Sequence, residues 1–204
     1  MHPNRAFDWD DREGALRFAA HRAFAHLFTA SGDDLFVVHV PIVVDDGRVR
    51  FHVARRNRIA EHLVDRPVLI SISGREAYQS ANWYVSEDQV PTWHYEAVEI
   101  EGVARALSKE ALVALLDAQS ERFEGEHSPE KPWTRSRMDP AKFEAMTKAI
   151  VGFEVEPTDI RGTRKFNQHK IGEDLAATIE GQRGAGRDDI VEAIAELTGK
   201  PSHD

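Results

Sequence analysis

The chain has 204 residues, contains no cysteine and carries a formal net charge of −9 at pH 7. The length suits one domain, or one domain with an appendage, and the lack of cysteine excludes disulfides, thiolate zinc sites and cysteine nucleophiles. The negative charge argues against a broad nucleic-acid surface, because phosphate neutralisation supplies most non-specific affinity. No apolar run reaches signal-peptide length at the N-terminus or the roughly 20 residues of a membrane span. We therefore expect a soluble, cytoplasmic protein without a membrane segment.

The first part of the chain predicts a helix followed by strands. The helix is expected over residues 11–22, because Asp10 can cap it and Glu13 stands where a capping-box carboxylate belongs. Further along, Asp45–Gly47 is a hairpin turn signal. The predicted strands, recognised by alternation and β-branched residues, cover residues 24–30, 34–44, 48–54, 66–74, 97–107 and 151–162.

Helices are expected between these strands and after them. A short one is predicted at residues 57–63. A longer one follows Ser108 as its cap and runs to about Phe123. A third begins with Asp139 as its cap and Pro140 at the first helical position, where proline is favoured.

The tail predicts two short helices, at residues 172–182 and 188–199, separated by a glycine-containing hinge. The second has apolar residues at Ile190, Val191, Ile194 and Leu197, and we expect it to dock on the barrel or on a partner subunit.

Short turns between strands favour an antiparallel arrangement over a doubly wound parallel sheet. The pattern predicts a mainly β, α+β fold: an antiparallel barrel or curled sheet with peripheral helices. We place its main domain at residues 1–170 and a C-terminal helical extension at residues 171–204. Residues 34–44 are apolar on both faces of the predicted strand, so the outer face needs a cover, which predicts a homodimer.

Motifs of the common enzyme classes are missing from the sequence, including the dinucleotide-binding GxGxxG, the Walker loop, GxSxG and HExxH. The ten histidines are scattered, and no metal site is expected from their spacing. No catalytic residues can be assigned from the sequence.

Two polar segments are candidates for ligand binding. Arg55, Arg56 and Arg58 crowd the predicted start of a helix beside Asn57, where backbone amides and guanidinium groups can bind an anion. The alternative is a solvated basic face. Residues 161–170 form the second segment, which is either a ligand site or a polar connector into the next helix.

The aromatic residues gather around one loop. Residues 80–102 contain Trp83, Tyr84, Trp93 and Tyr95, four of the large aromatic side chains in a chain that has few. Such side chains either pack a core or present flat, stiff surface with polar tips to a flat ligand.

Several segments, taken together, resemble a known family. They are "VVHVPIVV", "FHVARRN", "AYQSANWY", "VPTWHYEAVEIEG", "AIVGFEVE" and "KFNQHK", and they span about residues 7–170. Their order and spacing resemble the PaiB family of FMN-binding negative transcriptional regulators, which have a flavin split-barrel fold. This chain has His94 where the family usually has asparagine in "PTWNY", and it reads "KFNQH", ending at His169, where the family usually reads "KLSQN".

The resemblance implies an antiparallel split barrel that forms a homodimer with FMN in a groove between the subunits. It implies a phosphate site at the end of a barrel strand and walls of aromatic side chains beside the flavin ring. The implied cofactor-binding residues are His39, His52, Arg55, Arg56, Asn57, Ser80, Trp83, Tyr84, Trp93, Tyr95, Lys165 and Gln168.

The resemblance leaves two functions open. One is an FMN-binding transcriptional repressor, for which DNA is a partner by resemblance alone, since no helix-turn-helix with a basic second helix is recognisable. The other is a flavin- or haem-dependent oxidoreductase of the same superfamily, because a fold does not fix a function.

Overall fold

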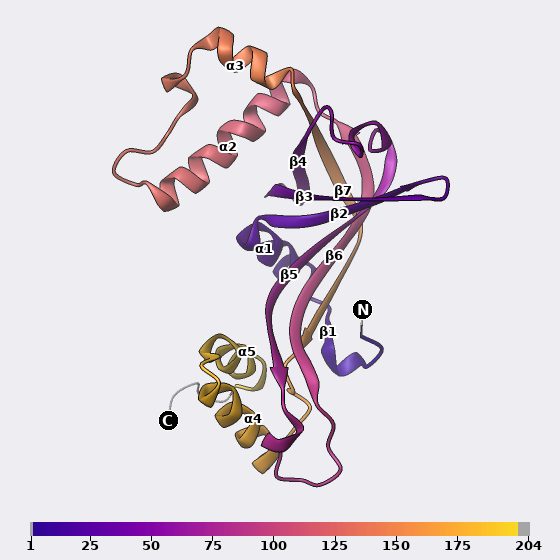
Figure 1. The fold of residues 1–204 in the computed structure, drawn as a ribbon, viewed down its shortest axis with the longest axis vertical. Coiled ribbons are helices and arrows are strands. Elements are labelled where there is room, and N and C mark those ends of the chain that lie inside the picture. Colours follow the sequence, from indigo (N-terminus) through magenta and orange to yellow (C-terminus); the bar gives the residue numbers. More distant parts are fainter. Residues whose placement is uncertain (1, 200–204) are drawn as a thin grey trace. The chain divides into compact units, whose positions relative to one another are not determined.

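The computed structural model describes residues 2–199 and consists mainly of antiparallel strands with helices around them (Figure 1). The strands are β1 (Asp8–Trp9), β2 (Phe24–Ser31), β3 (Asp34–Asp45), β4 (Arg48–Ala54), β5 (Arg66–Gln79), β6 (Thr92–Ala106) and β7 (Ile150–Lys165). The α-helices are α1 (Arg12–Arg22), α2 (Lys109–His127), α3 (Pro140–Thr147), α4 (Gly172–Gly184) and α5 (Asp188–Thr198). Short 3₁₀ helices are η1 (Arg5–Phe7), η2 (Ala60–His62), η3 (Ala81–Trp83) and η4 (Arg135–Arg137).

The strands form one sheet in the order β1-β7-β4-β3-β2-β5-β6, and β7 also pairs with β6. This second pairing closes strands β2 to β7 into a ring, to which β1 adds at β7. The predicted mainly β fold with an antiparallel barrel and peripheral helices is therefore confirmed. Ring closure leaves few exposed strand edges, which otherwise invite pairing with other chains.

The chain divides into two compact units. The first unit consists of the described parts of Met1–Arg12, Ser73–Val98 and Arg161–Asp204, and the second of Glu13–Ile72 and Glu99–Ile160. Strands β5, β6 and β7 each contribute residues to both units. The predicted domain boundary at residue 170 stays a prediction.

The core of the second unit follows the alternation predicted for β4. Val49, Phe51 and Val53 are buried, and the ring of Phe51 stacks on that of Phe153 with centroids 5.5 Å apart. The turn between β3 and β4 has positive φ at both Asp46 and Gly47, as a two-residue hairpin loop requires.

Both predicted helix caps of the second unit are confirmed. Ser108 accepts a hydrogen bond from the amide of Ala111 at 3.2 Å, and Asp139 accepts one from Lys142 at 2.8 Å. Helix α2 is longer than expected and runs to His127. In Figure 1 a long irregular loop joins α2 to α3.

The prediction of a helix at residues 57–63 is wrong. Only Ala60–His62 are helical, as the 3₁₀ helix η2. The side chain of Asn57 accepts the amide of Ile59 at 3.1 Å, a local bond that competes with helical hydrogen bonding. The segment closes at Asp65, which has a φ of 54°. The arginines after β4 therefore do not stand at the start of an α-helix.

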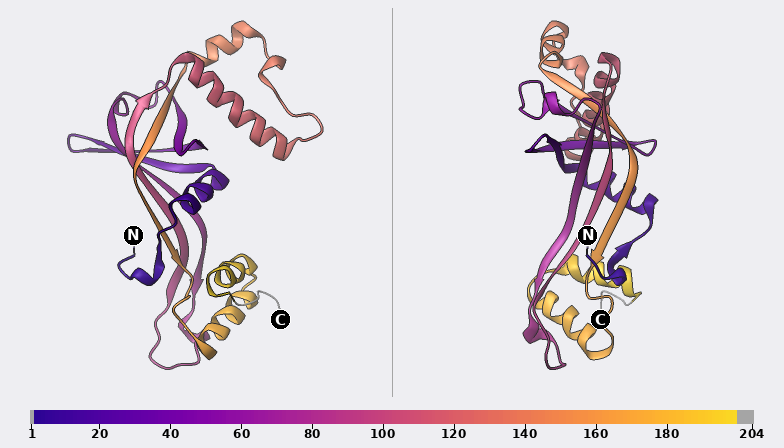
Figure 2. Two further views of the ribbon diagram at one scale, coloured as in Figure 1. Left: turned by 180° about the vertical axis from the view of Figure 1, so that it is seen from behind. Right: turned by 90° about the vertical axis from the view of Figure 1, so that its right-hand side faces the viewer.

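In the first unit, α4 and α5 pack on each other and on the ends of the long strands (Figure 2). The apolar stripe of α5 is buried here, against Ala77 of β5, Phe166 and Leu175. Of the two surfaces considered for this helix, it therefore covers its own chain. The buried members of this small core are Ala77, Phe166, Leu175, Ile190, Ala193 and Ile194.

Candidate functional site

The predicted cofactor-binding residues are divided between the two units. His39, His52, Arg55, Arg56 and Asn57 lie in the second unit, and Ser80, Trp83, Tyr84, Trp93, Tyr95, Lys165 and Gln168 lie in the first. The first unit brings more of these side chains into contact with one another than the second.

A polar cluster joins the aromatic loop to the segment after β7. The side-chain amide of Asn167 donates to the hydroxyl of Tyr84 at 2.7 Å and lies 3.3 Å from the hydroxyl of Thr178 in α4. The ammonium group of Lys170 lies 4.8 Å from the centroid of the Tyr84 ring and donates to Gln89 at 2.6 Å. Two segments about 80 residues apart in sequence thus form one cluster, and burial raises the pKa of Tyr84.

His94 lies at the bottom of this region and is 0% exposed. Neither of its ring nitrogens has a hydrogen-bond partner among the described residues, and its ring meets that of Phe166 at 6.0 Å between centroids. Burial lowers the pKa of His94 to about 4; the side chain of Asn167 opposes this shift, and the nearby charges of Lys165 and His169 add to it. The imidazole is therefore neutral at pH 7.

Lys165 and Gln168 have different surroundings. The ammonium group of Lys165 donates to the hydroxyl of Thr92 at 2.6 Å, and burial lowers its pKa. Gln168 accepts from the amide of Phe166 at 2.9 Å and donates to the carbonyl of Ala6 at 3.0 Å. Gln168 thus holds the turn around Asn167, whereas Lys165 keeps a cation at the strand end.

The four aromatic residues differ in what covers them. A Cβ added to Gly181 of α4 would lie 2.4 Å from the ring of Trp83, so the backbone of α4 rests directly on that ring. Trp93, by contrast, is 57% exposed, and its ring meets the ring of Tyr78, 49% exposed, edge to face at 6.0 Å. Tyr95 is half-buried. The exposed flat surface comes from Trp93 and from Tyr78, which the sequence reasoning did not select.

Ser80 has a local structural contact. Its hydroxyl accepts a hydrogen bond from the amide of Asn82 at 3.2 Å and caps the short helix η3. The predicted role of Ser80 at the cofactor stays a prediction.

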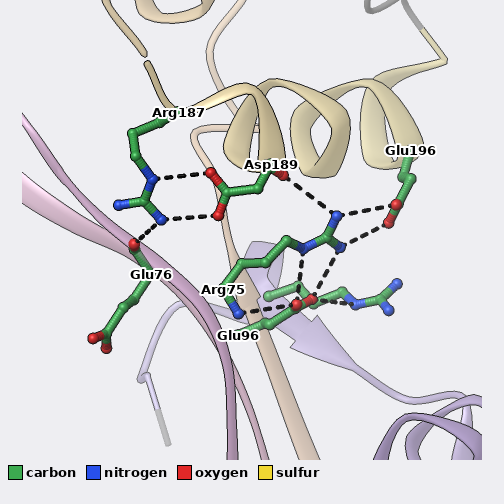
Figure 3. A network of polar contacts seen from close by, with 7 residues as sticks. Arg75, Glu76, Glu96, Arg187, Asp189 and Glu196 are labelled. Carbon is green, nitrogen blue, oxygen red and sulfur yellow. Dashed lines mark hydrogen bonds and ion pairs between the residues drawn. The ribbon is translucent and has the colours of Figure 1, made fainter. Parts of the chain in front are cut away.

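A buried ion-pair network borders this region and was not predicted (Figure 3). The carboxylate of Glu96, almost fully buried, receives the Arg75 guanidinium at 2.9 Å and that of Arg164 at 3.5 Å. Arg75 also reaches α5, where it binds Glu196 at 3.0 Å and the carbonyl of Asp189 at 3.4 Å. The hydrogen bond from Arg75 lowers the pKa of Glu196. The network therefore fastens α5 to strands β5 and β6.

In the second unit, the predicted anion-binding arginines lie in different environments. Arg55 donates from its side chain to the carbonyls of Lys148 at 2.9 Å and Ile150 at 3.1 Å. Arg58 donates to the carbonyl of Leu35 at 3.1 Å. Arg56 is exposed. Two of the three guanidinium groups thus bind backbone carbonyls, and Arg56 is the one best placed to meet an anion from solution.

The two predicted histidines of this unit also differ. His39 is exposed and its ring meets that of His26 on the neighbouring strand at 4.7 Å. His52 is half-buried on the outer face of β4, where burial lowers its pKa. Its Nδ1 is buried and has no hydrogen-bond partner among the described residues.

The first unit has the kinds of group that a flavin needs. Trp93 and Tyr78 offer flat apolar surface, and Lys165 supplies a cation for a phosphate. Within residues 2–199, no three histidines, aspartates or glutamates are placed to hold a metal ion, and no helix is long and apolar enough to cross a membrane.

Comparisons with known proteins agree with this fold and chemistry. The family model described as "Putative FMN-binding domain" matches residues 1–159. The chain is similar to "Protease synthase and sporulation protein PAI 2" of Bacillus subtilis, with 29% identity over 187 residues, which are 88% of each chain.

Two solved structures are similar in fold. The FAD and heme binding protein of Mycobacterium smegmatis superposes with a TM-score of 0.63 and 14% identity, over 83% of this chain and 79% of that one. The flavocytochrome Anf3 of Azotobacter vinelandii superposes with a TM-score of 0.58 and 17% identity, over 86% of this chain and 74% of that one. The family match covers most of the chain and confirms the resemblance to PaiB proteins: this chain belongs to the FMN-binding domain family, and FMN is its cofactor.

Proposed function

We propose that this protein is a PaiB-type regulator that binds FMN through the first unit, with the flavin ring against Trp93 and Tyr78. The observation that carries the proposal is the exposure of these two rings, at 57% and 49%, side by side at the ends of two strands. Large aromatic side chains are usually well buried, so an exposed pair signals a binding surface.

The neighbouring polar groups support the same placement. Lys165 is bonded to Thr92, the residue before Trp93, and its ammonium group can form charge-assisted hydrogen bonds with an anion. Tyr84 and Lys170 continue this polar surface. When bound, FMN supplies the redox-active flavin ring, while these residues bind and orient it.

Two matched variants test the placement of the ring. Trp93→Phe removes the larger part of an exposed aromatic surface, whereas Trp83→Phe changes a ring that packs beneath Gly181. FMN is titrated into each variant while tryptophan and flavin fluorescence are recorded. We expect Trp93→Phe to weaken FMN binding and to lose most of the tryptophan quenching. Trp83→Phe is expected to retain both.

A third variant tests whether the ammonium group of Lys165 contributes to FMN binding. Lys165→Met should weaken FMN binding by about 1.5–3 kcal/mol, the typical contribution of a hydrogen bond to a charged group. Arg56→Ala tests separately the prediction that residues 52–57 meet the phosphate. If Trp93→Phe and Lys165→Met both bind FMN as tightly as the parent, the ring and phosphate lie elsewhere and this placement is wrong.

We also propose that the protein acts as a homodimer. The outward face of β2 and β3 exposes the apolar side chains of Phe24, Phe28, Leu35 and Val37 around the His26–His39 pair, and Phe28 and Val37 are direct cross-strand partners. An apolar sheet face of this kind is normally covered. Light scattering at micromolar concentration is expected to give twice the chain mass, and a monomer mass would contradict the proposal.

Transcriptional repression in the cytoplasm is the role that the likeness to the PaiB family suggests. Since the net charge is −9, any DNA binding must come from a local basic surface, and its affinity should fall steeply with salt. A mobility-shift assay at two stated salt concentrations tests it.

The alternative is an oxidoreductase that uses flavin or haem. It is suggested by the descriptions of the two similar solved structures, one an FAD and heme binding protein and the other a flavocytochrome. A haem Soret band in the purified protein would support this alternative.

A further inference from the structure

A pocket of about 340 Å³ lies in the second unit, between α2, α3 and the outer face of β4. Each helix lines it with residues at helical spacing: Leu116 and Ser120 on α2, and Phe143 and Met146 on α3. Trp133 and Met138, from the loop between the helices, close it further. The volume is at the small end of the range for small-molecule sites.

The lining is mainly apolar, and its charged groups compensate each other. Arg135 binds Asp117 at 3.0 Å, and its guanidinium also lies 5.3 Å from the centroid of the Phe143 ring. Thr147 donates its hydroxyl to the carbonyl of Glu144 at 2.9 Å. Among the lining residues no unpaired cation is left for a phosphate or carboxylate. The pocket is thus suited to a neutral ligand.

One lining side chain has unused hydrogen-bonding capacity. The Nδ1 atom of His52 is fully buried and has no hydrogen-bond partner among the described residues. Burial lowers the pKa of His52, so the ring is neutral and offers one donor and one acceptor. A polar group left unpartnered in an apolar site is costly, and a ligand that supplies the missing partner relieves that cost.

A second hollow of about 550 Å³ adjoins the pocket. The two share Asp117, Ser120, Trp133 and Arg135 as lining residues, and residues 132–136 line the second. This loop is held by bonds such as that from the amide of Trp133 to Glu124 at 3.0 Å.

We infer that this pocket is a second binding site, which accepts a neutral, largely aromatic small molecule and hydrogen-bonds its one polar group through His52. The site is made entirely of residues of the second unit, and it does not depend on where FMN binds in the first. His52, which the sequence suggested for the phosphate, is assigned here to a different ligand.

The test uses N-phenyl-1-naphthylamine, a neutral aromatic probe with one N–H group, whose fluorescence rises in apolar surroundings. We expect it to bind the purified protein and to receive energy from Trp133, so that Trp133→Phe lowers the transfer. Ser120→Trp fills the pocket and should weaken the probe more than tenfold. Ala118→Trp, an exposed position on the same helix outside the pocket, should change its affinity less than twofold.

A second variant tests His52 without filling the pocket. His52→Leu should weaken the probe about fivefold, as loss of one hydrogen bond predicts. The competitor 1-phenylnaphthalene, which lacks the N–H group, should bind the parent and this variant equally. Thermal melting confirms that each variant is folded, and if Ser120→Trp is not, His52→Leu and the competitor decide the result. The proposed site would be contradicted if the parent and Ser120→Trp bound the probe equally well, or if Ala118→Trp lost as much affinity for the probe as Ser120→Trp. An unchanged affinity in His52→Leu would overturn the role of His52.

Discussion

The buried His94 makes the stability of the first unit depend on pH. Its pKa is about 4 in the folded protein, against 6.5 for a free histidine, because burial penalises the charged ring. Between these values the unfolded chain binds a proton that the folded chain does not. The free energy of unfolding must therefore fall as the pH is lowered from 6.5 towards 4. Below pH 4 both states are protonated and this contribution stops changing.

The size of the effect follows from the two pKa values. A difference of one in pKa corresponds to about 1.4 kcal/mol, so the full effect is about 3 kcal/mol. Between pH 7 and pH 4.5, about 2 kcal/mol of it should be lost. The perturbation is His94→Asn, which removes the titrating ring and leaves the other histidines in place.

Urea unfolding followed by tryptophan fluorescence suits this measurement, because Trp9, Trp83 and Trp93 all lie in the first unit. The parent should lose about 2 kcal/mol more than His94→Asn between pH 7 and pH 4.5. The control is His169→Asn. His169 is far more exposed than His94, although partial burial lowers its pKa too, so this variant should keep most of the parent's pH dependence. Equal pH dependence in the parent and His94→Asn would refute the reasoning that His94 is buried and neutral.

Three further predictions concern single contacts. Arg75→Met should lower the free energy of unfolding by about 3 kcal/mol in urea melts, because it leaves the buried Glu96 with only Arg164. The control Glu196→Gln changes the half-exposed partner of Arg75 and should lower the free energy of unfolding much less. Equal losses in the two variants would contradict a buried network. Gly181→Ala should destabilise the first unit by about 1–3 kcal/mol, because the new Cβ overlaps the ring of Trp83, and an unchanged urea midpoint would show that the helix does not rest there. Arg55→Ala should lower the melting temperature, because Arg55 binds two backbone carbonyls, whereas Arg56→Ala should leave it unchanged; the reverse order would contradict these contacts.

Local chemistry was enough to predict most of the fold. The caps Ser108 and Asp139, the alternation of β4 and the turn predicted at Asp45–Gly47 all act through neighbours in sequence, and all were found as expected. The strand expected to end at Gly74 instead continues to Gln79, because β5 lies beside β6 in the sheet, and Arg75 on this extension contacts Glu96, 21 residues further along. Such a partner cannot be recognised from sequence spacing.

The candidate site was predictable in composition but not in arrangement. The sequence identified the aromatic loop and the segment around Asn167, which the structure joins through Tyr84. It could not separate Trp83 from Trp93, because the difference depends on Gly181, about a hundred residues away. Tyr78 was missed because a lone tyrosine in a strand carries no signal until its neighbour on the next strand is known.

The visible absorbance spectrum of the purified protein shows whether it binds FMN through Trp93 and Lys165. The purified protein is incubated with FMN, passed through a desalting column and scanned, with the protein concentration measured in the same sample. We expect flavin bands retained at one FMN per chain, and their loss when Trp93→Phe and Lys165→Met are combined. A protein that emerges without flavin bands, or with a haem band in their place, would contradict this expectation.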